Sequence, residues 1–398
     1  MHPSPLLERP DAVAGAPQDV DATVPAHYGS PLPEQAALVE GLALSALARD
    51  VVAVTGPDRL SWLTTLSSQV LTHLAPGDGG VETLLMDAQG HITHALAALD
   101  DGQVLWLVTE AGAGPALADF LDSMRFMLRV EATDRPDVQV LGAMGQGLEA
   151  LEEAARSVNL PDPHAGTALV GTWHDPWPGV VEGGTSYDLG RTRPHPGQDY
   201  RAGMVLVPRD AVARVAEAFL GEEAPDGRRR LAGALAWEAL RVEAGRPRAA
   251  REVDARTIAH ELDWLRTAVH LSKGCYPGQE TIARTLNLGR PPRRLTILQL
   301  DGLGGRAPVP GAVVRLGERA VGTVTSVVRH HECGPMALAL LRRGVPSDAA
   351  LSVDLEEHEA GGDRGPARVD ATQEILVAPE GRAQASPAQR PGAELRRR

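Results

Sequence analysis

Hydrophobic and polar positions recur with two different periods along the chain, and the changes of period predict where helices and strands lie. Helical spacing predicts a helix over residues 34–49, and a β-rich run predicts a strand over 51–55. Asp58 is a suitable N-cap for the next helix. Strand-like runs separated by turn signals then predict an antiparallel meander over 81–86, 91–99 and 103–109.

The middle of the chain mixes short strands with further predicted helices over 115–127, 148–157 and 211–219. The Gly-Ala-Gly run at 112–114 precedes the first of these helices and resembles the start of a dinucleotide-binding loop. However, Leu117 takes the place of the third glycine, and the neighbouring strands are expected to be antiparallel. Both features argue against a Rossmann unit.

A helix predicted over 229–244 carries the first candidate for ligand binding. One side of this helix is apolar and is expected to face a core, whereas Trp237 lies on the opposite side. A tryptophan there needs another partner, and a neighbouring domain and a flat ligand both fit. The apolar side consists of Leu231, Leu235, Ala239 and Val242.

Glu243 lies in the last turn of the same predicted helix, with Gly245 placed as the C-cap. A carboxylate at that end opposes the helix dipole by about 0.3 to 1 kcal/mol unless hydrogen-bond donors compensate. Arg241 or Arg246 could supply such donors. The N–H groups of a bound cyclic guanidine or amide are the functional alternative.

Beyond residue 290 the pattern changes to strands separated by glycine-rich turns, which predicts a small antiparallel barrel. The run His330-His331-Glu332-Cys333 contains residue types that bind metals. Adjacent residues in a strand or turn point in different directions, and no second group of ligands is recognisable in the sequence. We therefore predict no metal site. The predicted strands cover 295–300, 312–316, 320–328 and 336–341.

Length and composition limit the class of protein. A chain of 398 residues is expected to form several domains, and its net charge of -13 argues against a surface that coats nucleic acid. Two cysteines are too few for a disulfide framework and indicate a reduced, cytoplasmic setting. Residues 1–33 and 353–398 have the composition of disordered tails. The first tail lacks the features of a signal peptide, and the apolar runs are too short to span a bilayer.

The run KGCYPGQE, residues 273–280, is the centre of the functional prediction. Lys273 is the only lysine of the chain, which suggests that this place requires a compact ammonium and not an arginine fork. Cys275 is predicted to lie on a tight turn ahead of a short helix over 279–286. The helix N-terminus and Lys273 both favour the thiolate form. A buried structural cysteine is the alternative.

This octapeptide resembles the YgfZ branch of the folate-binding proteins related to the glycine-cleavage T-protein, as do the preceding WEALRVEAGRPR and the later VGTVTS and ALALLRRG. The resemblance covers about residues 47–345. It implies an α+β fold of three domains in a ring around a central folate cavity, with a small antiparallel β-barrel at the C-terminal end. The implied regions are 34–136 (folate-binding), 137–290 (second α+β region) and 291–352 (barrel).

The resemblance also assigns residues to a tetrahydrofolate site. Trp237 lies where the YgfZ branch has a tryptophan that contacts folate, and Glu243 lies where T-proteins hold the pterin with a glutamate. Arg49 replaces a second aromatic residue of that branch and is expected to face the glutamate tail of the folate. The octapeptide is expected to supply Cys275 and Lys273 as the catalytic pair, and Tyr276, Gln279 and Glu280 as residues that shape the loop and bind the cofactor.

The function implied by the resemblance is that of a tetrahydrofolate-binding accessory protein for iron-sulfur cluster assembly or repair. Its expected partners are iron-sulfur enzymes, including some that modify tRNA, or the assembly machinery, without direct contact to nucleic acid or membrane. A folate-dependent aminomethyl- or methyltransferase and a scaffold with a vestigial cavity are the alternatives. T-proteins carry an acidic residue just after the meander glycine, whereas residues 90–95 read GHITHA, which argues against aminomethyl transfer.

Overall fold

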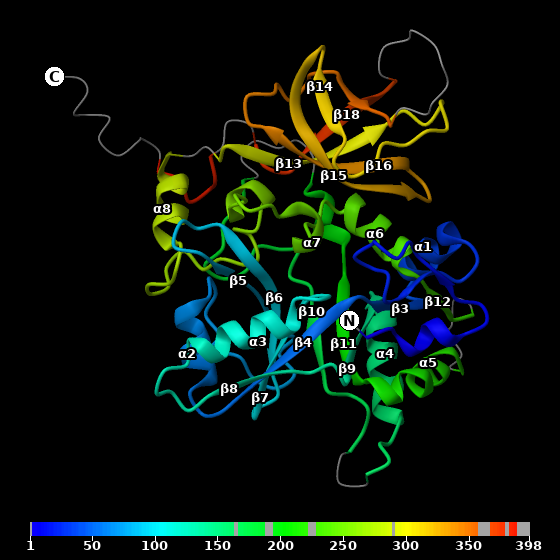
Figure 1. Cartoon of the computed structure of the whole chain (residues 1–398), viewed down its shortest axis with the longest axis vertical. Coiled ribbons are helices and arrows are strands. Elements are labelled where there is room, and N and C mark those ends of the chain that lie inside the picture. Colours follow the sequence, from blue (N-terminus) through cyan, green and yellow to red (C-terminus); the bar gives the residue numbers. More distant parts are fainter. Residues whose placement is uncertain are drawn as a thin grey trace, which may run out of the picture. The chain divides into compact units, whose positions relative to one another are not determined.

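The computed structural model of this protein describes residues 2–162, 166–187, 194–221, 228–288, 291–356, 367–378 and 382–387. The chain forms two compact units. The first contains Met1–Leu84, His94–Pro176 and Tyr200–Leu240, and the second contains Leu85–Thr93, Trp177–Asp199 and Arg241–Arg398. Both units combine helices with strands, as Figure 1 shows, which confirms the predicted α+β class.

The first unit contains a five-stranded sheet in the order β10 (Gly171–His174), β11 (Ala202–Pro208), β9 (Val138–Met144), β3 (Ala43–Leu47) and β12 (Arg230–Ala232). Every residue of β3 and β9 is buried. Two helices lie side by side and pack their apolar side chains into one core with this sheet (Figure 1). They are α4 (Gln146–Ser157) and α5 (Val212–Gly221), close to the predicted helices over 148–157 and 211–219.

A second five-stranded sheet has the order β5 (Val81–Met86), β6 (Ile92–Asp100), β7 (Val104–Glu110), β4 (Arg49–Thr55) and β8 (Glu131–Asp134). Strands β5, β6 and β7 are neighbours in the order in which they occur in the chain, which confirms the predicted meander. Helix α2 (Arg59–Leu66) follows Asp58, and α3 (Gly114–Ser123) starts at the Gly-Ala-Gly run. The amides of Gly112 and Gly114 donate to the carboxylate of Asp50, at 2.8 and 3.0 Å. That carboxylate occupies donors that a phosphate would need, which agrees with the prediction against a dinucleotide loop.

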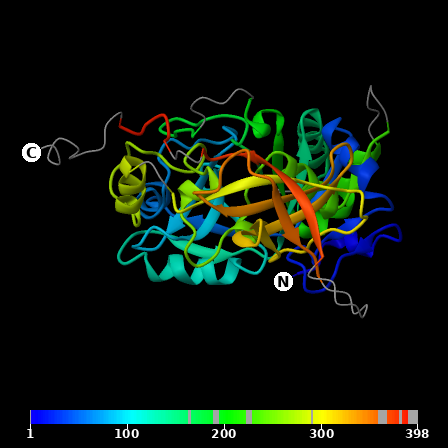
Figure 2. The same ribbon diagram turned by 90° about the horizontal axis from the view of Figure 1, so that it is seen from above.

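The second unit contains a closed barrel of six antiparallel strands. Figure 2 shows its yellow, orange and red strands crossing one another at an angle. Leucine, valine and alanine side chains fill the barrel interior. The predicted barrel is thus confirmed. The strands follow the order β13 (Arg293–Leu300), β16 (Gly334–Arg342), β15 (Arg319–His330), β14 (Val313–Leu316), β17 (Leu351–Asp354) and β18 (Arg368–Ile375).

The predicted tail over 353–398 is wrong in part, because β18 and the end of β17 complete the barrel. In β18, the buried Val369 and Ala371 alternate with the exposed Asp370 and Thr372. This two-residue period is a strand signal, but it is short and follows a stretch rich in glycine and charged residues. The composition of the segment therefore predicted a disordered tail, although its local pattern indicates a strand.

The predicted tail over 1–33 also differs from the structure. It contains the 3₁₀ helix η1 (Pro5–Glu8) and a small antiparallel sheet of β1 (Val13–Ala14) and β2 (Pro25–His27). Leu6 and Val24 are each only 1% exposed and belong to the core of the first sheet. Burial of these isolated apolar residues orders a segment whose composition is otherwise polar.

The helix predicted over 34–49 is wrong in its second half. Helix α1 (Pro31–Val39) is followed by Gly41, which adopts the left-handed conformation with φ 73°. That conformation ends the helix, and the chain continues as β3. Because β3 is buried on both faces, its apolar run shows no alternation that would distinguish it from a helix.

The helix predicted over 229–244 is divided between β12 and α6 (Ala234–Glu243). Leu231 lies on the strand, so the predicted apolar side of one continuous helix does not exist. Leu235, which was expected in the core, is 50% exposed, whereas Trp237 is only 7% exposed. Two short helical elements follow α6, namely α7 (Ala249–Glu252) and η4 (Ala259–Leu262). No helix among the described residues is long and apolar enough to cross a membrane.

Candidate functional site

The KGCYPGQE motif forms an irregular loop that leads into α8 (Gln279–Leu288) in the second unit. Cys275 is a free thiol and is exposed. The alternative of a buried structural cysteine is therefore wrong. The short helix predicted over 279–286 is confirmed, and it begins just after the thiol along the chain.

Glycine is required where this loop meets the turn between β5 and β6. Gly278 has φ 81°, and a Cβ atom on it would lie 2.8 Å from the Cα atom of Gly90. The hydroxyl of Thr281 donates to the carbonyl of Gln89 at 2.6 Å. The turn between β5 and β6 thus supports, from one side, the loop that carries Cys275.

Lys273 is half-buried beside an aromatic ring. Its ammonium nitrogen lies 4.8 Å from the ring centroid of Tyr276, within the range of a cation–π contact. Burial lowers the pKa of Lys273 to about 8, because it disfavours the charged amine, and it raises the pKa of the buried Tyr276 to about 12. At neutral pH the lysine remains mostly an ammonium, but it exchanges its proton far more readily than an ordinary lysine.

We expect Lys273 to react with acylating reagents at unusually low pH. Its pKa of about 8 lies below the ordinary 10.5, and each unit changes the amine fraction tenfold. At neutral pH its free-amine fraction is therefore expected to be roughly 300 times that of an exposed lysine. Competitive labelling with acetic anhydride over a pH range that includes both pKa values, followed by mass spectrometry of the peptide that contains Lys273, measures the pH at which half of the lysine has lost its proton. An Arg156→Lys variant supplies an exposed lysine as control, and equal midpoints for the two lysines would contradict the prediction.

The remaining predicted loop residues take different positions. The side-chain amide of Gln279 donates to the backbone carbonyl of Lys273 at 3.3 Å, so Gln279 shapes the loop as expected. Tyr276 is buried, and Glu280 is exposed in the first turn of α8. Contact of these three residues with a cofactor stays a prediction.

Asp87 and His91 are candidate site residues that the sequence analysis missed. Asp87 lies in the turn beneath the loop, and its carboxylate is 2.9 Å from Nδ1 of His91. Burial alone would raise the pKa of Asp87, but hydrogen bonds from His91 and Gln89 outweigh it and hold this pKa below its ordinary value. Asp87 thus supplies a carboxylate three residues before Gly90, in the turn that contacts the Cys275 loop. This contact between distant segments of the chain is visible only in the structure.

Trp237 is buried, and its ring packs against strand β9 of the first unit. A Cβ atom on Gly142 of β9 would lie 2.7 Å from Cη2 and Cζ3 of the indole. The ring edge therefore rests directly on the backbone of β9, where only glycine leaves room. This contact supplies a packing partner for Trp237, and stacking of a pterin on its ring stays a prediction.

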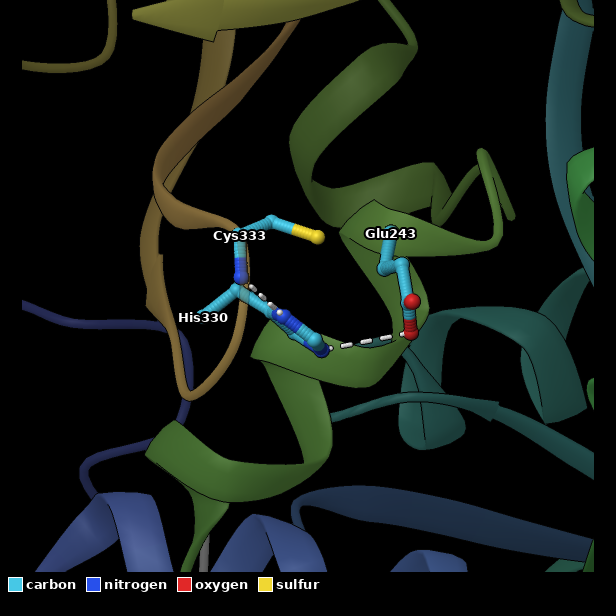
Figure 3. Close-up of side chains that lie close together, drawn as sticks. All are labelled: Glu243, His330 and Cys333. Atoms are coloured by element: carbon cyan, nitrogen blue, oxygen red, sulfur yellow. Dashed lines mark hydrogen bonds and ion pairs between the residues drawn. The ribbon is translucent and has the colours of Figure 1, made fainter. Parts of the chain in front are cut away.

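Glu243 is the last residue of α6, and Gly245 ends the helix with φ 63° as predicted. Neither arginine considered as a donor is its partner, since Arg241 binds Glu252 and Arg246 lies over the ring of Trp177. Instead, one carboxylate oxygen of Glu243 lies 3.2 Å from Nε2 of His330 (Figure 3).

Cys333 lies beside this pair, and one ligand atom each from Glu243, His330 and Cys333 fall within 4.8 Å of one another (Figure 3). The prediction against a metal site assumed that no further ligand accompanies His330 and Cys333, and Glu243 shows that this assumption was wrong. Burial, reinforced by the charges of Glu243 and two further glutamates, raises the pKa of the Cys333 thiol.

The hydrogen bonds of His330 determine which chemistry this cluster offers. Its Nδ1 accepts from the amides of Glu332 and Cys333, at 3.3 and 3.1 Å. In the neutral ring the proton is therefore on Nε2, the nitrogen that faces Glu243. A metal at Nε2 would require the proton on Nδ1, opposite two amide hydrogens, so the cluster fits a hydrogen-bond donor better than a metal ligand.

Arg49 has an ion-pair partner of its own. It lies directly opposite Glu110 in the pairing of β4 with β7, and the two side chains are 3.1 Å apart. Arg49 also borders a cavity of about 130 Å³, which is small beside the roughly 300 to 1,000 Å³ of typical ligand pockets. The expected contact with the glutamate tail of a folate stays a prediction.

Comparison with known proteins gives a sequence relative and matches to solved structures. A chloroplast protein of Arabidopsis thaliana, described as a candidate transferase, is 39% identical over 95 residues. The match spans 24% of this chain and 21% of that protein, so it covers only about a fifth of the relative. No family model matches the chain.

Aminomethyltransferase T of the glycine cleavage system from Bartonella henselae superposes with a TM-score of 0.67. The match covers 95% of this chain and 97% of the other, at 19% sequence identity. At that identity the match establishes the fold and nothing more specific. The chain therefore has the fold of a glycine-cleavage aminomethyltransferase.

Proposed function

We propose that this chain is a tetrahydrofolate-binding accessory protein that supports iron-sulfur cluster assembly or repair through Cys275. The observation that carries this proposal is the exposed thiol on a glycine-supported loop, two residues from the half-buried Lys273. An amine with a pKa of about 8 can take up or release a proton near neutral pH. Exposure of the thiol, with a proton carrier two residues away along the chain, favours a chemical role for Cys275 over a packing role.

The folate part of the proposal is supported by the fold and by two residues of α6. A pterin needs a flat partner and a carboxylate that accepts its paired N–H groups, and Trp237 and Glu243 provide these groups. The side chain of Glu243 is 44% exposed, whereas Trp237 is 7% exposed. We therefore assign the first contact with the pterin to Glu243.

The proposed work of Cys275 is to carry an intermediate. Its thiolate either attacks a one-carbon unit on the folate, so that a carbon–sulfur bond forms while the carbon–nitrogen bond to the folate breaks and that nitrogen takes up a proton, or receives a sulfur or metal intermediate for an iron-sulfur protein. In the sulfur case the donor is a persulfide, whose outer sulfur is transferred while the donor's own thiolate leaves. Both reactions need a thiol that stays reduced, and both cysteines of the chain are free. A reducing compartment such as the cytoplasm, with iron-sulfur enzymes or their assembly machinery as partners, fits this chemistry.

Titration with tetrahydrofolate tests the folate site directly. We expect saturable quenching of tryptophan fluorescence, most of which is lost in Trp237→Phe, because an aromatic ring is kept for packing while the indole is removed. Trp62→Phe is the matched control, since the Trp62 indole is also buried and its N–H has no hydrogen-bond partner in the part of the chain that the structure describes. Equal quenching in both variants would remove Trp237 from the site, and no quenching of the wild type would contradict the folate site itself.

A folate-dependent aminomethyl- or methyltransferase is the second candidate function. The fold match is an aminomethyltransferase and the Arabidopsis relative is described as a candidate transferase. Asp87 also places a carboxylate in the turn beneath the Cys275 loop. Turnover of a methylamine-loaded lipoyl carrier with tetrahydrofolate, lost in Asp87→Asn, would favour this function over the accessory role.

A further inference from the structure

His330 is a buried imidazole whose orientation is fixed from one side. The residue is 2% exposed, and its Nδ1 accepts hydrogen bonds from two consecutive residues of the β15–β16 turn. These amides leave Nδ1 no room for a proton, so the ring is held in the tautomer with its proton on Nε2. The fold thus presents a single N–H donor at a defined point beside the C-terminal end of α6.

This donor lies beside a carboxylate but makes no hydrogen bond. Nε2 of His330 is 3.2 Å from Oε2 of Glu243, yet the N–H is not directed at that oxygen, and among the described residues the buried Nε2 has no hydrogen-bond partner. The Glu243 side chain is 44% exposed and has room to turn. A small rotation of the carboxylate is sufficient to form the bond and would leave its other oxygen facing outward.

We propose that His330 positions Glu243 for ligand binding: the imidazole N–H holds one carboxylate oxygen, so that the other is presented to the N–H donors of a pterin. The inference rests on the proposed folate function and names a residue that makes no contact with the ligand itself. Forming the His330–Glu243 bond satisfies a buried donor, and binding of the ligand orients the same carboxylate. The two events therefore favour each other.

The charge and dipole at this place agree with such a role. Glu243 ends α6, where the unpaired carbonyl groups of the helix repel a carboxylate. A donor from outside the helix offsets that repulsion without neutralising the carboxylate, whereas an arginine would compete with the ligand for both oxygens. A neutral histidine with one N–H can engage only one oxygen, which is the property that a positioning residue needs here.

A double-mutant cycle on tetrahydrofolate affinity tests the inference. We expect His330→Phe to raise Kd about tenfold, the size of one lost charge-assisted hydrogen bond. His330→Gln, whose amide nitrogen can replace Nε2, is expected to restore most of the affinity. In a Glu243→Gln background, His330→Phe is expected to have little further effect, because the two residues act through one interaction. Calorimetric titration of the four proteins gives these values, with His331→Phe as the matched control on the neighbouring residue.

A spectroscopic measurement makes the test independent of whether the His330 variants fold. Nitrogen-15 spectra of histidine-labelled wild type are expected to show the Nε2–H tautomer for His330. The Nε2 signal is expected to shift on folate binding and to lose that shift in Glu243→Gln, a change at a half-exposed side chain.

Three results would overturn the inference while leaving the folate function intact. The first is an unchanged Kd for tetrahydrofolate in His330→Phe. The second is a loss of affinity on His330→Phe that is the same in the wild-type and the Glu243→Gln background. The third is binding of Zn²⁺ that depends on Cys333 and removes the proton from Nε2 of His330. Failure of the wild type to bind tetrahydrofolate is a different result, because it contradicts the proposed function and the inference together.

Discussion

Cys275→Ser is expected to abolish the function of the protein in cells. In a host that lacks its own protein of this kind, we expect the wild-type chain to restore the activity of an iron-sulfur enzyme and the variant to leave it at the level of an empty vector. Serine keeps the size of the side chain but is a far weaker nucleophile and metal ligand than a thiolate. Because Cys275 is exposed, the melting temperature is expected to stay within about 2 °C of the wild type.

The control for this experiment is the other cysteine. Cys333 is also a free, exposed thiol, so Cys333→Ser removes the same group from the same unit. Partial removal of this thiol from water, together with the charges of three glutamates, raises its pKa and thereby disfavours its thiolate. We expect Cys333→Ser to complement fully. Full rescue by Cys275→Ser would remove this thiol from the mechanism, and loss of rescue in both variants would indicate a general need for thiols.

The turn that carries Cys275 could be predicted from sequence because its signal is local, whereas the exposure of the thiol was left open. Gly274, Pro277 and Gly278 define a turn through backbone conformation alone, and Gly278 does adopt a positive φ. The meander and the helices α4 and α5 were predictable for the same reason, since each has a clear period and well-marked ends. Local patterns of this kind predict the structure correctly because the conformation they indicate does not depend on contacts with distant segments.

Features that depend on distant segments could not be predicted. Strand β12 and helix α6 were predicted as one continuous helix because Gly233, the residue between them, interrupts a helical pattern only weakly. The role of Gly233 is visible only from its contacts. Its amide donates to the carboxylate of Glu34 at 2.9 Å, and a Cβ atom there would clash with the backbone of Ala26. Likewise, the sequence gives no sign that Glu243 meets His330, because they lie on different elements and neither is the ordinary partner of the other.

Arg241, one of the two arginines considered as donors to Glu243, shows why such pairs are hard to predict. Arg241 is two residues from Glu243, and on a helix these positions point in different directions. Its guanidinium instead binds Glu252, which is on α7, and the hydroxyl of Ser326 on β15. Proximity in the sequence suggested a pair of Arg241 with Glu243, whereas in the structure Arg241 pairs with the buried Glu252.

This buried network leads to the largest expected effect on stability. The guanidinium of Arg241 is 3.0 Å from the carboxylate of Glu252, and their side chains are 3% and 0% exposed. The carboxylate also accepts from the hydroxyl groups of Thr325 and Ser326, at 2.9 and 2.6 Å, and from the amide of Arg248 at 2.9 Å. These contacts join α6, α7 and β15 within the second unit.

Glu252→Gln is expected to lower the free energy of unfolding of the second unit by about 3 to 5 kcal/mol, because it removes the negative charge of Glu252 from beside the buried guanidinium of Arg241. Urea unfolding followed by circular dichroism measures this loss. In Arg241→Met combined with Glu252→Gln, the loss is expected to be smaller than the sum of the single losses, since removing both charges avoids an unpaired one. Glu318→Gln is the control, because it breaks an ion pair with Arg368 in which the acid is 85% exposed, and its transition is expected to match the wild type. A loss below about 1 kcal/mol for Glu252→Gln would mean that water reaches the network and that packing alone joins these elements.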